Sequence, residues 1–142
     1  MRLAITFILV VFLTGSCNEK LYTGDVNCDE CYTDKPESAD LVIDVTLNNL
    51  YYQVPIVVYK GDVEENVVVA VDTADYTPFY VLVPVDEKYA VKAEYKKGES
   101  VLYVIDGTKI KLRSVTDACD EPCYIIEGET LDARIKKEFI DY

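Results

Sequence analysis

The sequence predicts an all-β fold, a single antiparallel β-sandwich of seven to nine short strands. From residue 40 to the end of the chain, short runs of alternating apolar and polar residues follow one another, and this period of two is typical of half-buried strands. Turn residues separate the runs at intervals of about 8 to 12 residues, which is typical of sandwiches and small barrels; we favour the sandwich. After the N-terminal segment, no run of about eleven residues has helical periodicity, so βαβ units are not expected.

The first predicted strand shows the alternation most clearly. Leu41, Ile43 and Val45 alternate with Asp44 and Thr46, so one face of this strand is expected to be buried. The predicted strands lie, in order, within residues 40–49, 55–60, 66–71, 78–85, 88–96, 100–105, 108–115, 124–127 and 130–136. Together they form one domain, because a chain of this length is too short for two.

Turn chemistry punctuates these strands. Lys97-Gly98 and Asp106-Gly107 each separate two alternating runs, and Asp-Gly is a strong signal for a tight hairpin. We therefore predict three consecutive antiparallel strands over residues 88–114. Pro84 has no N–H to donate to a neighbouring strand, so its own strand is expected at a sheet edge or bent at that point.

The first seventeen residues, MRLAITFILVVFLTGSC, have the features of an export signal. Arg2 precedes an apolar run that is shorter than the roughly 20 residues needed to span a membrane, and small residues follow it, as in a cleaved signal peptide. The segment resembles the lipobox of bacterial lipoproteins, in which the cysteine becomes the acylated first residue; Thr14 and Ser16 depart from the usual pattern of that family. The resemblance implies lipidation at Cys17, and the alternative is an ordinary signal peptide with Cys17 as a structural thiol.

The other four cysteines form two short clusters, Cys28 with Cys31 and Cys119 with Cys123. Lipidation of Cys17 leaves this even set, which in an oxidising compartment is expected to form two disulfides. Three pairings are open, and we favour bridges between the clusters because these close loops of about 90 residues. A four-thiolate zinc site is the alternative, and a redox-active pair is disfavoured by the acids between the first two cysteines.

Three segments are therefore expected: a signal peptide over residues 1–16, a lipid-anchored polar tether over residues 17–39, and the β-sandwich domain over residues 40–142. The tether is turn-rich and has few apolar residues to bury. The eleven steps from Cys17 to Cys28 reach about 35 Å when extended, enough to hold the domain clear of a bilayer.

Composition excludes several classes of function. The full chain has 14 basic and 26 acidic residues, a net charge of −12, and no histidine or tryptophan. Such an acidic protein is repelled by phosphate backbones, so we expect no nucleic-acid partner. Without histidine there is no catalytic triad of the Ser-His-Asp kind and no imidazole base. No cofactor, metal ion or catalytic residue is predicted.

Residues 80–95, YVLVPVDEKYAVKAEY, resemble prealbumin-like and carboxypeptidase-regulatory-like domains, which are small seven-stranded sandwiches. The order of a lipobox, the CDEC cluster and the segment VIDGTKIKLRSVTDACDEPCY also resembles a group of small bacterial lipoproteins without an assigned activity. These resemblances imply a prealbumin-like or immunoglobulin-like sandwich and an envelope location, but no reaction.

Twelve tyrosines raise the question of an aromatic binding surface. Tyr89 and Tyr95 share one strand face with small apolar residues and are expected in the core. Tyr51, Tyr52 and Tyr76 fall in predicted loops beside polar residues, where sandwiches commonly bind their partners, and these three form the predicted binding site.

Charged clusters are expected to be solvated. Asp72 with Asp75, and the acids of residues 117–121, lack the spacing of a dedicated calcium loop. Basic residues alternate over residues 109–113, where cross-strand pairing with acids is the simplest expectation.

The sequence therefore favours a lipid-anchored, non-enzymatic binding or scaffolding module of the bacterial cell envelope, at the outer membrane, on its periplasmic face or on the cell surface. Its expected partners are the membrane, through the lipid anchor, and an envelope protein or a glycan. The alternatives are a small secreted enzyme, hydrolytic or thiol-redox, and a carbohydrate-binding module.

Overall fold

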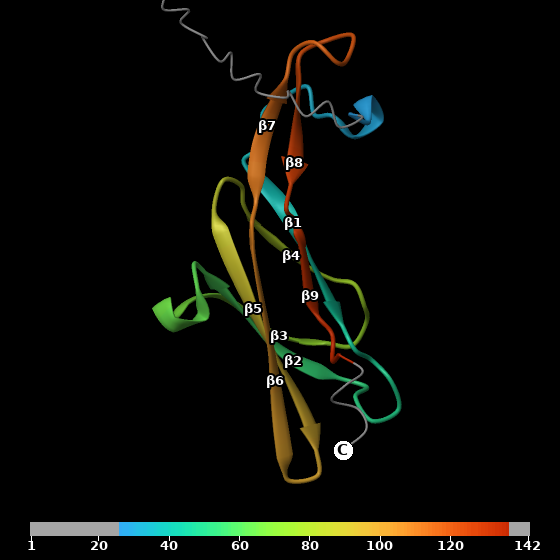
Figure 1. Ribbon diagram of the computed structural model, residues 1–142, viewed down its shortest axis with the longest axis vertical. Coiled ribbons are helices and arrows are strands. Elements are labelled where there is room, and N and C mark those ends of the chain that lie inside the picture. The colour runs from blue at the N-terminus through green and yellow to red at the C-terminus, as the bar shows by residue number, and fades with distance from the viewer. Residues whose placement is uncertain (1–25, 137–142) are drawn as a thin grey trace, which may run out of the picture.

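The computed structural model describes residues 26–136, which form nine β-strands and two short 3-10 helices (Figure 1). The all-β prediction is confirmed. The elements, in chain order, are η1 (Cys28–Glu30), β1 (Ser38–Val45), β2 (Val54–Lys60), η2 (Val63–Glu65), β3 (Val67–Ala74), β4 (Phe79–Pro84), β5 (Lys88–Lys97), β6 (Ser100–Lys109), β7 (Lys111–Val115), β8 (Cys123–Glu127) and β9 (Thr130–Ala133).

Two sheets and a separate strand pair make up the fold. One sheet has the order β4-β1-β9 and the other β3-β2-β5-β6, while β7 and β8 pair with each other. The β7–β8 pair and the β5–β6 hairpin lie at opposite ends of the long axis (Figure 1). The prediction of a wholly antiparallel arrangement is wrong at one place, because β9 runs parallel to β1. The chain leaves β8 in the same direction as β1 runs, so β9 joins the sheet without reversing.

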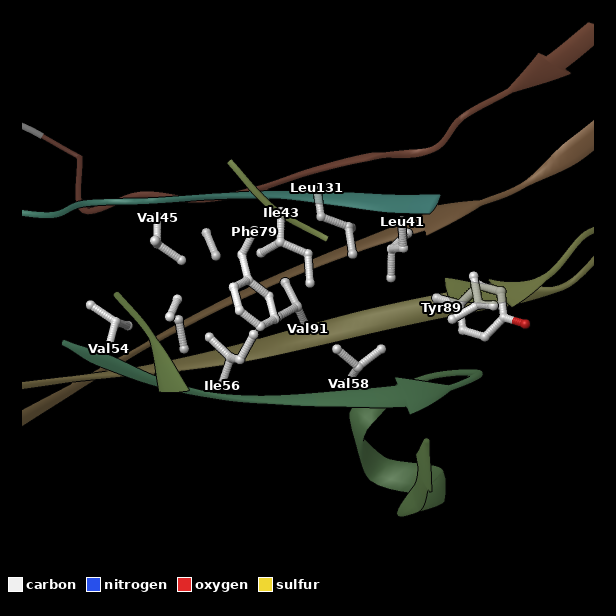
Figure 2. Close-up of a cluster of buried hydrophobic side chains, with 14 of the residues drawn as sticks. Leu41, Ile43, Val45, Val54, Ile56, Val58, Phe79, Tyr89, Val91 and Leu131 are labelled. Carbon is white, nitrogen blue, oxygen red and sulfur yellow. The ribbon is translucent and has the colours of Figure 1, made fainter. Parts of the chain in front are cut away.

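The core lies between the two sheets and is formed by the alternating residues that the sequence singles out. Leu41 and Ile43 of β1 face Ile56 and Val58 of β2, with Val91 of β5 between them (Figure 2). All five side chains are almost completely buried. Full burial of such a side chain contributes about 1.5 to 3 kcal/mol, so this layer accounts for much of the stability of the sandwich.

Strand β5 places two tyrosines in the core, as predicted. Tyr89 and Tyr95 are each about 1% exposed, and both lie on the inner face with Val91. The Tyr89 hydroxyl donates a hydrogen bond to the backbone oxygen of Pro84 at 2.9 Å. The polar end of that ring therefore has a partner while its apolar body is buried.

The two predicted hairpins have different outcomes. Lys97-Gly98 does connect β5 to β6, and Gly98 has the positive φ of 62° that such a turn requires. The prediction of a turn at Asp106-Gly107 is wrong: β6 continues through it, and Gly107 pairs with Ala90. The Asp106 carboxylate accepts the N–H of Gly107 at 2.9 Å and that of Asp132 at 2.7 Å, so it ties β6 to β9 in place of forming a turn.

The prediction for Pro84 is confirmed. It ends β4, which is an edge strand paired only with β1 among the described strands. Its partner in the register is Ser38. A residue without an N–H is tolerated at such an edge because no neighbouring strand needs that donor.

Two disulfides fasten the N-terminal described segment to the β7–β8 pair. Cys28 is bonded to Cys119, and Cys31 to Cys123. Both bridges join the two cysteine clusters, which confirms the disulfides and the favoured long-range pairing. The zinc alternative has no free thiolates: the sulfurs of Cys31, Cys119 and Cys123 lie within 4.8 Å of one another but are all in disulfides.

The predicted tether, residues 17–39, is described from residue 26 onward. Tyr32 exchanges backbone hydrogen bonds of 2.8 Å with Tyr124, and β1 begins at Ser38, two residues before the predicted start of the domain. With the disulfides at Cys28 and Cys31, this stretch is part of the folded unit. The signal peptide, Cys17 and the first part of the tether lie outside the described residues.

Candidate functional site

The loops that carry the three predicted binding tyrosines lie at one end of the sandwich. Val54 at the start of β2 pairs with Ala74 at the end of β3, so the end of loop 46–53 lies beside the start of loop 75–78. A hydrogen bond of 3.2 Å from the N–H of Val45 to the Thr77 hydroxyl joins β1 to the second loop. We call this region the tyrosine end.

The first loop is shaped by Asn48. Its side-chain oxygen accepts the N–H groups of Leu50 at 2.8 Å and Tyr51 at 3.0 Å, an arrangement in which an asparagine side chain supports a tight turn. Asn48 and Tyr51 also exchange backbone hydrogen bonds of 3.0 and 3.1 Å. This closed loop fixes the position of Tyr51 and turns the chain so that Tyr52 follows on the surface.

Tyr51 is held by the core. It is partly buried, and its ring meets that of Tyr95 edge to face, with 5.2 Å between the ring centroids. The Tyr95 hydroxyl accepts the N–H of Thr46 at 3.0 Å and donates to the carbonyl of Ala133 at 2.6 Å. Burial raises the pKa of Tyr95 above its ordinary value, so its hydroxyl keeps its proton and remains a donor.

A shallow depression of about 360 Å³ opens beside these tyrosines. It is lined by residues of the first loop and of the outer face of the β3-β2-β5-β6 sheet: Leu50, Tyr51, Tyr52, Gln53, Pro55, Thr73, Glu94 and Lys96. Tyr52 is 74% exposed, so most of its ring is available to a ligand. The depression combines aromatic surface, an amide and a pair of opposite charges.

The charged side of the depression is an ion pair on β5. The Lys96 ammonium lies 2.7 Å from the Glu94 carboxylate, and this hydrogen bond, against some desolvation, holds the pKa of Glu94 below its usual value. The pair is oriented and ionised at neutral pH. It can therefore accept or donate hydrogen bonds to hydroxyl or amide groups of a ligand.

Tyr76 occupies the second loop and does not line the depression. Its ring centroid is 5.2 Å from that of Phe79, and the residue is 52% exposed. The structure thus brings Tyr51 and Tyr52 together and leaves Tyr76 on the same end as a separate aromatic surface.

Only Tyr51 and Tyr52 of this depression are predicted binding residues, and its charged pair, Glu94 and Lys96, was not predicted from the sequence. The alternation of β5 does place them on the face opposite Tyr89 and Tyr95, and that was readable from the sequence. The missing information was the pairing of β2 with β5, in which Ile56 lies opposite Ala93, since this register brings Glu94 beside Pro55 at the end of the first loop.

The acidic clusters form local hydrogen bonds. The Asp72 carboxylate accepts the N–H of Thr73 at 2.7 Å, and that of Asp117 accepts the hydroxyl of Thr116 at 3.1 Å. On the basic run of residues 109–113, Arg113 pairs with Glu127 on the neighbouring strand at 2.8 Å. That cross-strand ion pair confirms the expectation for Arg113.

Comparison of the chain with protein-family profiles, with curated sequences and with solved structures finds no match. Over residues 26–136, no helix is long and apolar enough to cross a membrane. Disulfides such as Cys28–Cys119 and Cys31–Cys123 persist in oxidising compartments. They indicate a protein that works outside the cytoplasm.

Proposed function

We propose that the chain is a lipid-anchored, non-enzymatic β-sandwich lipoprotein of the bacterial cell envelope that binds a partner through its tyrosine end. The observation that carries the binding role is the exposed ring of Tyr52 beside the core-held ring of Tyr51. A rigid aromatic surface loses little conformational freedom on binding, and aromatic residues contribute much of the energy in protein recognition.

The anchoring part of the proposal is supported by the TGSC end of the apolar segment and by the cysteine count. The two disulfides account for four of the five cysteines, so Cys17 is the one left for acylation. Mass spectrometry of the mature protein is expected to find a lipid-bearing N-terminus at Cys17. A mature chain that starts elsewhere and carries no lipid would overturn this part.

The binding part is tested by capture from a detergent-solubilised envelope with the native lipidated protein. Replacement of Tyr52 and Tyr76 by alanine is expected to reduce capture of the same partner about tenfold or more, because removal of an aromatic hot spot costs about 2 kcal/mol or more. The matched control is Tyr32→Ala, since Tyr32 lies near the disulfides, far from the tyrosine end, and is 51% exposed. Equal losses in both variants would contradict a site at the tyrosine end.

The non-enzymatic part is tested on the purified protein. No turnover is expected with peptide, glycan or disulfide substrates, because the chain has no histidine and the four described cysteines are in disulfides. Hydrolysis or catalytic disulfide exchange by the folded protein, absent after the protein is unfolded, would overturn the non-enzymatic part of the proposal.

A further inference from the structure

Strand β3 is a sheet edge with an open side. It pairs with β2, and no described strand pairs with its other side. Two of the other sheet edges are partly protected: β4 ends in Pro84, and β6 is tied to β9 through the Asp106 carboxylate. Proline is a common protection of an exposed edge, and so is a bulge, which β3 itself has opposite Val58 and Tyr59. The regular open stretch of β3 is therefore residues 70–74.

Strand β3 carries four exposed valines. Val67 and Val68 are each 50% exposed, Val69 41% and Val71 72%. Valine is a strong strand former that packs well against a neighbouring strand, yet these residues face solvent. An exposed row of this kind is suited to pairing with a further strand.

The backbone groups that face the open side can be assigned. The N–H of Gly61, just after β2, donates to the carbonyl of Lys88 at 2.8 Å, so the odd-numbered residues of β2 face β5 and the even-numbered ones face β3. Ile56 pairs with Asp72, and Asp72 therefore bonds to β2 while Val71 and Thr73 face outward. Consistently, the N–H of Thr73 donates to the Asp72 side chain.

The charge around this edge favours a basic partner strand over a second copy of the chain as the occupant. Acids stand near both ends of β3, with Glu64 before it, Asp72 within its last three residues and Asp75 just after it; all three are exposed, and β3 itself carries no basic residue. The whole chain has a net charge of −12. Two copies joined at this edge would bring like charges together, whereas a strand with basic flanks would meet opposite charges at both ends.

We propose that the open edge of β3 receives an extended segment of a partner protein as an added strand, with β-branched residues at its centre and lysine or arginine at its flanks. Added strands of this kind bind through backbone hydrogen bonds and gain specificity from their side chains. The inference deepens the proposed binding role and rests on it. Thr73 belongs both to β3 and to the depression at the tyrosine end, so one partner can contact both surfaces.

The test uses the disulfide-bonded protein and two peptides, Lys-Lys-Val-Thr-Val-Thr-Val-Lys-Lys and the same sequence with glutamate in place of each lysine. We expect the lysine peptide to slow amide exchange at Val71 and to shift NMR signals of β3. We also expect it to bind about tenfold more tightly than the glutamate peptide, with the difference shrinking as salt is added. Equal binding of both peptides, binding of neither, or protection elsewhere would overturn the proposal.

Two variants at Val71 identify the binding edge. Val71→Pro removes the outward N–H and is expected to abolish peptide binding, while Val71→Thr keeps that N–H and a branched side chain and is expected to bind as the wild type does. If the proline variant does not fold, Val71→Lys serves instead: it keeps the backbone donor but places a positive charge against the lysine flanks and is expected to weaken binding about fivefold. Unchanged binding in the folded variant would overturn the proposal.

Sedimentation of the free protein tests the other occupant. If the wild-type protein is a dimer and Val71→Pro or Val71→Lys makes it a monomer, then β3 pairs with a second copy and the proposal is wrong. Failure at β3 and failure of the proposed function are distinguishable, because Tyr52→Ala with Tyr76→Ala affects capture at the tyrosine end without removing any backbone group of β3.

Discussion

Strand β1 runs between two ends of the molecule that are held in different ways. Where it begins, Cys28 and Cys31 are bonded covalently to Cys119 and Cys123 in the region of β7 and β8, and we call this region the disulfide end. Where it ends, the tyrosine end is held by packing and by the hydrogen bonds of Tyr95 with Thr46 and Ala133.

The difference follows from the apolar surface available at each end. In β7 and β8, only Val115 and Cys123 are buried, whereas Tyr95 continues the main core into the tyrosine end. A strand pair with so little to bury cannot offset its loss of conformational entropy by packing alone. Disulfides supply the missing constraint there, and the tyrosine end needs none.

The largest expected effect is at the disulfide end. Replacement of Cys31 and Cys123 by alanine opens a bridge between residues 92 positions apart. We expect the free energy of unfolding to fall by about 2 to 5 kcal/mol, because a long closed loop strongly restricts the unfolded chain. Urea denaturation measures this, and a loss of less than about 1 kcal/mol would contradict the role given to this bridge.

The next effect is at the tyrosine end. Tyr95→Phe removes the hydroxyl that joins Thr46 and Ala133 and leaves their backbone groups without this partner. We expect a loss of about 1 to 3 kcal/mol in the free energy of unfolding, which is the usual cost of an unsatisfied buried polar group. Tyr32→Phe, at a side chain that is 51% exposed, is the control and is expected to leave the stability unchanged.

A smaller effect separates the two neighbouring tyrosines of the first loop. Tyr51→Ala removes the edge-to-face contact with Tyr95 and is expected to cost about 1 to 2 kcal/mol from the lost ring contact and burial. Tyr52→Ala is expected to change stability by less than about 0.5 kcal/mol, since Tyr52 is largely exposed. Thermal unfolding compares them, and equal losses would show that Tyr52 is also a packing residue.

How far the sequence predicts the fold can be read from β5. Its alternation identifies Tyr89 and Tyr95 as buried, because a period of two fixes which residues share a face. The same rule does not say which strand lies beside β5 or where the outer face meets a loop. The sequence therefore does not predict that Glu94 and Lys96 of β5 line the depression.

Local turn signals were less reliable than alternation. Asp106-Gly107 has the composition of a hairpin turn, yet the carboxylate of Asp106 bonds to Asp132, a residue 26 positions away. A contact between residues so far apart depends on the fold as a whole and overrides the local preference. The pairing of the cysteines also depends on the fold as a whole, since it requires η1 to lie near β7 and β8 (Figure 1). The sequence could therefore favour the long-range pairing but could not fix it.

The smallest expected effect lies where the disulfide end joins the sandwich, at Glu129. This partly buried residue precedes β9, and its backbone oxygen accepts the N–H of Val42 at 2.8 Å. Burial raises the pKa of the Glu129 carboxyl above its ordinary value of 4.5, and the nearby charge of Glu30 raises it further. Both causes disfavour the ionised carboxylate in the folded protein.

A raised carboxyl pKa means that the folded state binds a proton more tightly than the unfolded chain does. The ionised group therefore lowers stability at pH values above the folded pKa, and this penalty disappears as the pH falls through the folded pKa toward 4.5. Glu129→Gln is expected to raise the thermal midpoint at pH 7 and to have no such effect near pH 4. Glu99→Gln, in the exposed turn between β5 and β6, is the control. A gain from Glu129→Gln that is as large at pH 4 as at pH 7 would show that the carboxylate is not destabilised by its charge, and that the junction tolerates an ionised group as readily as the solvent-exposed hairpin does.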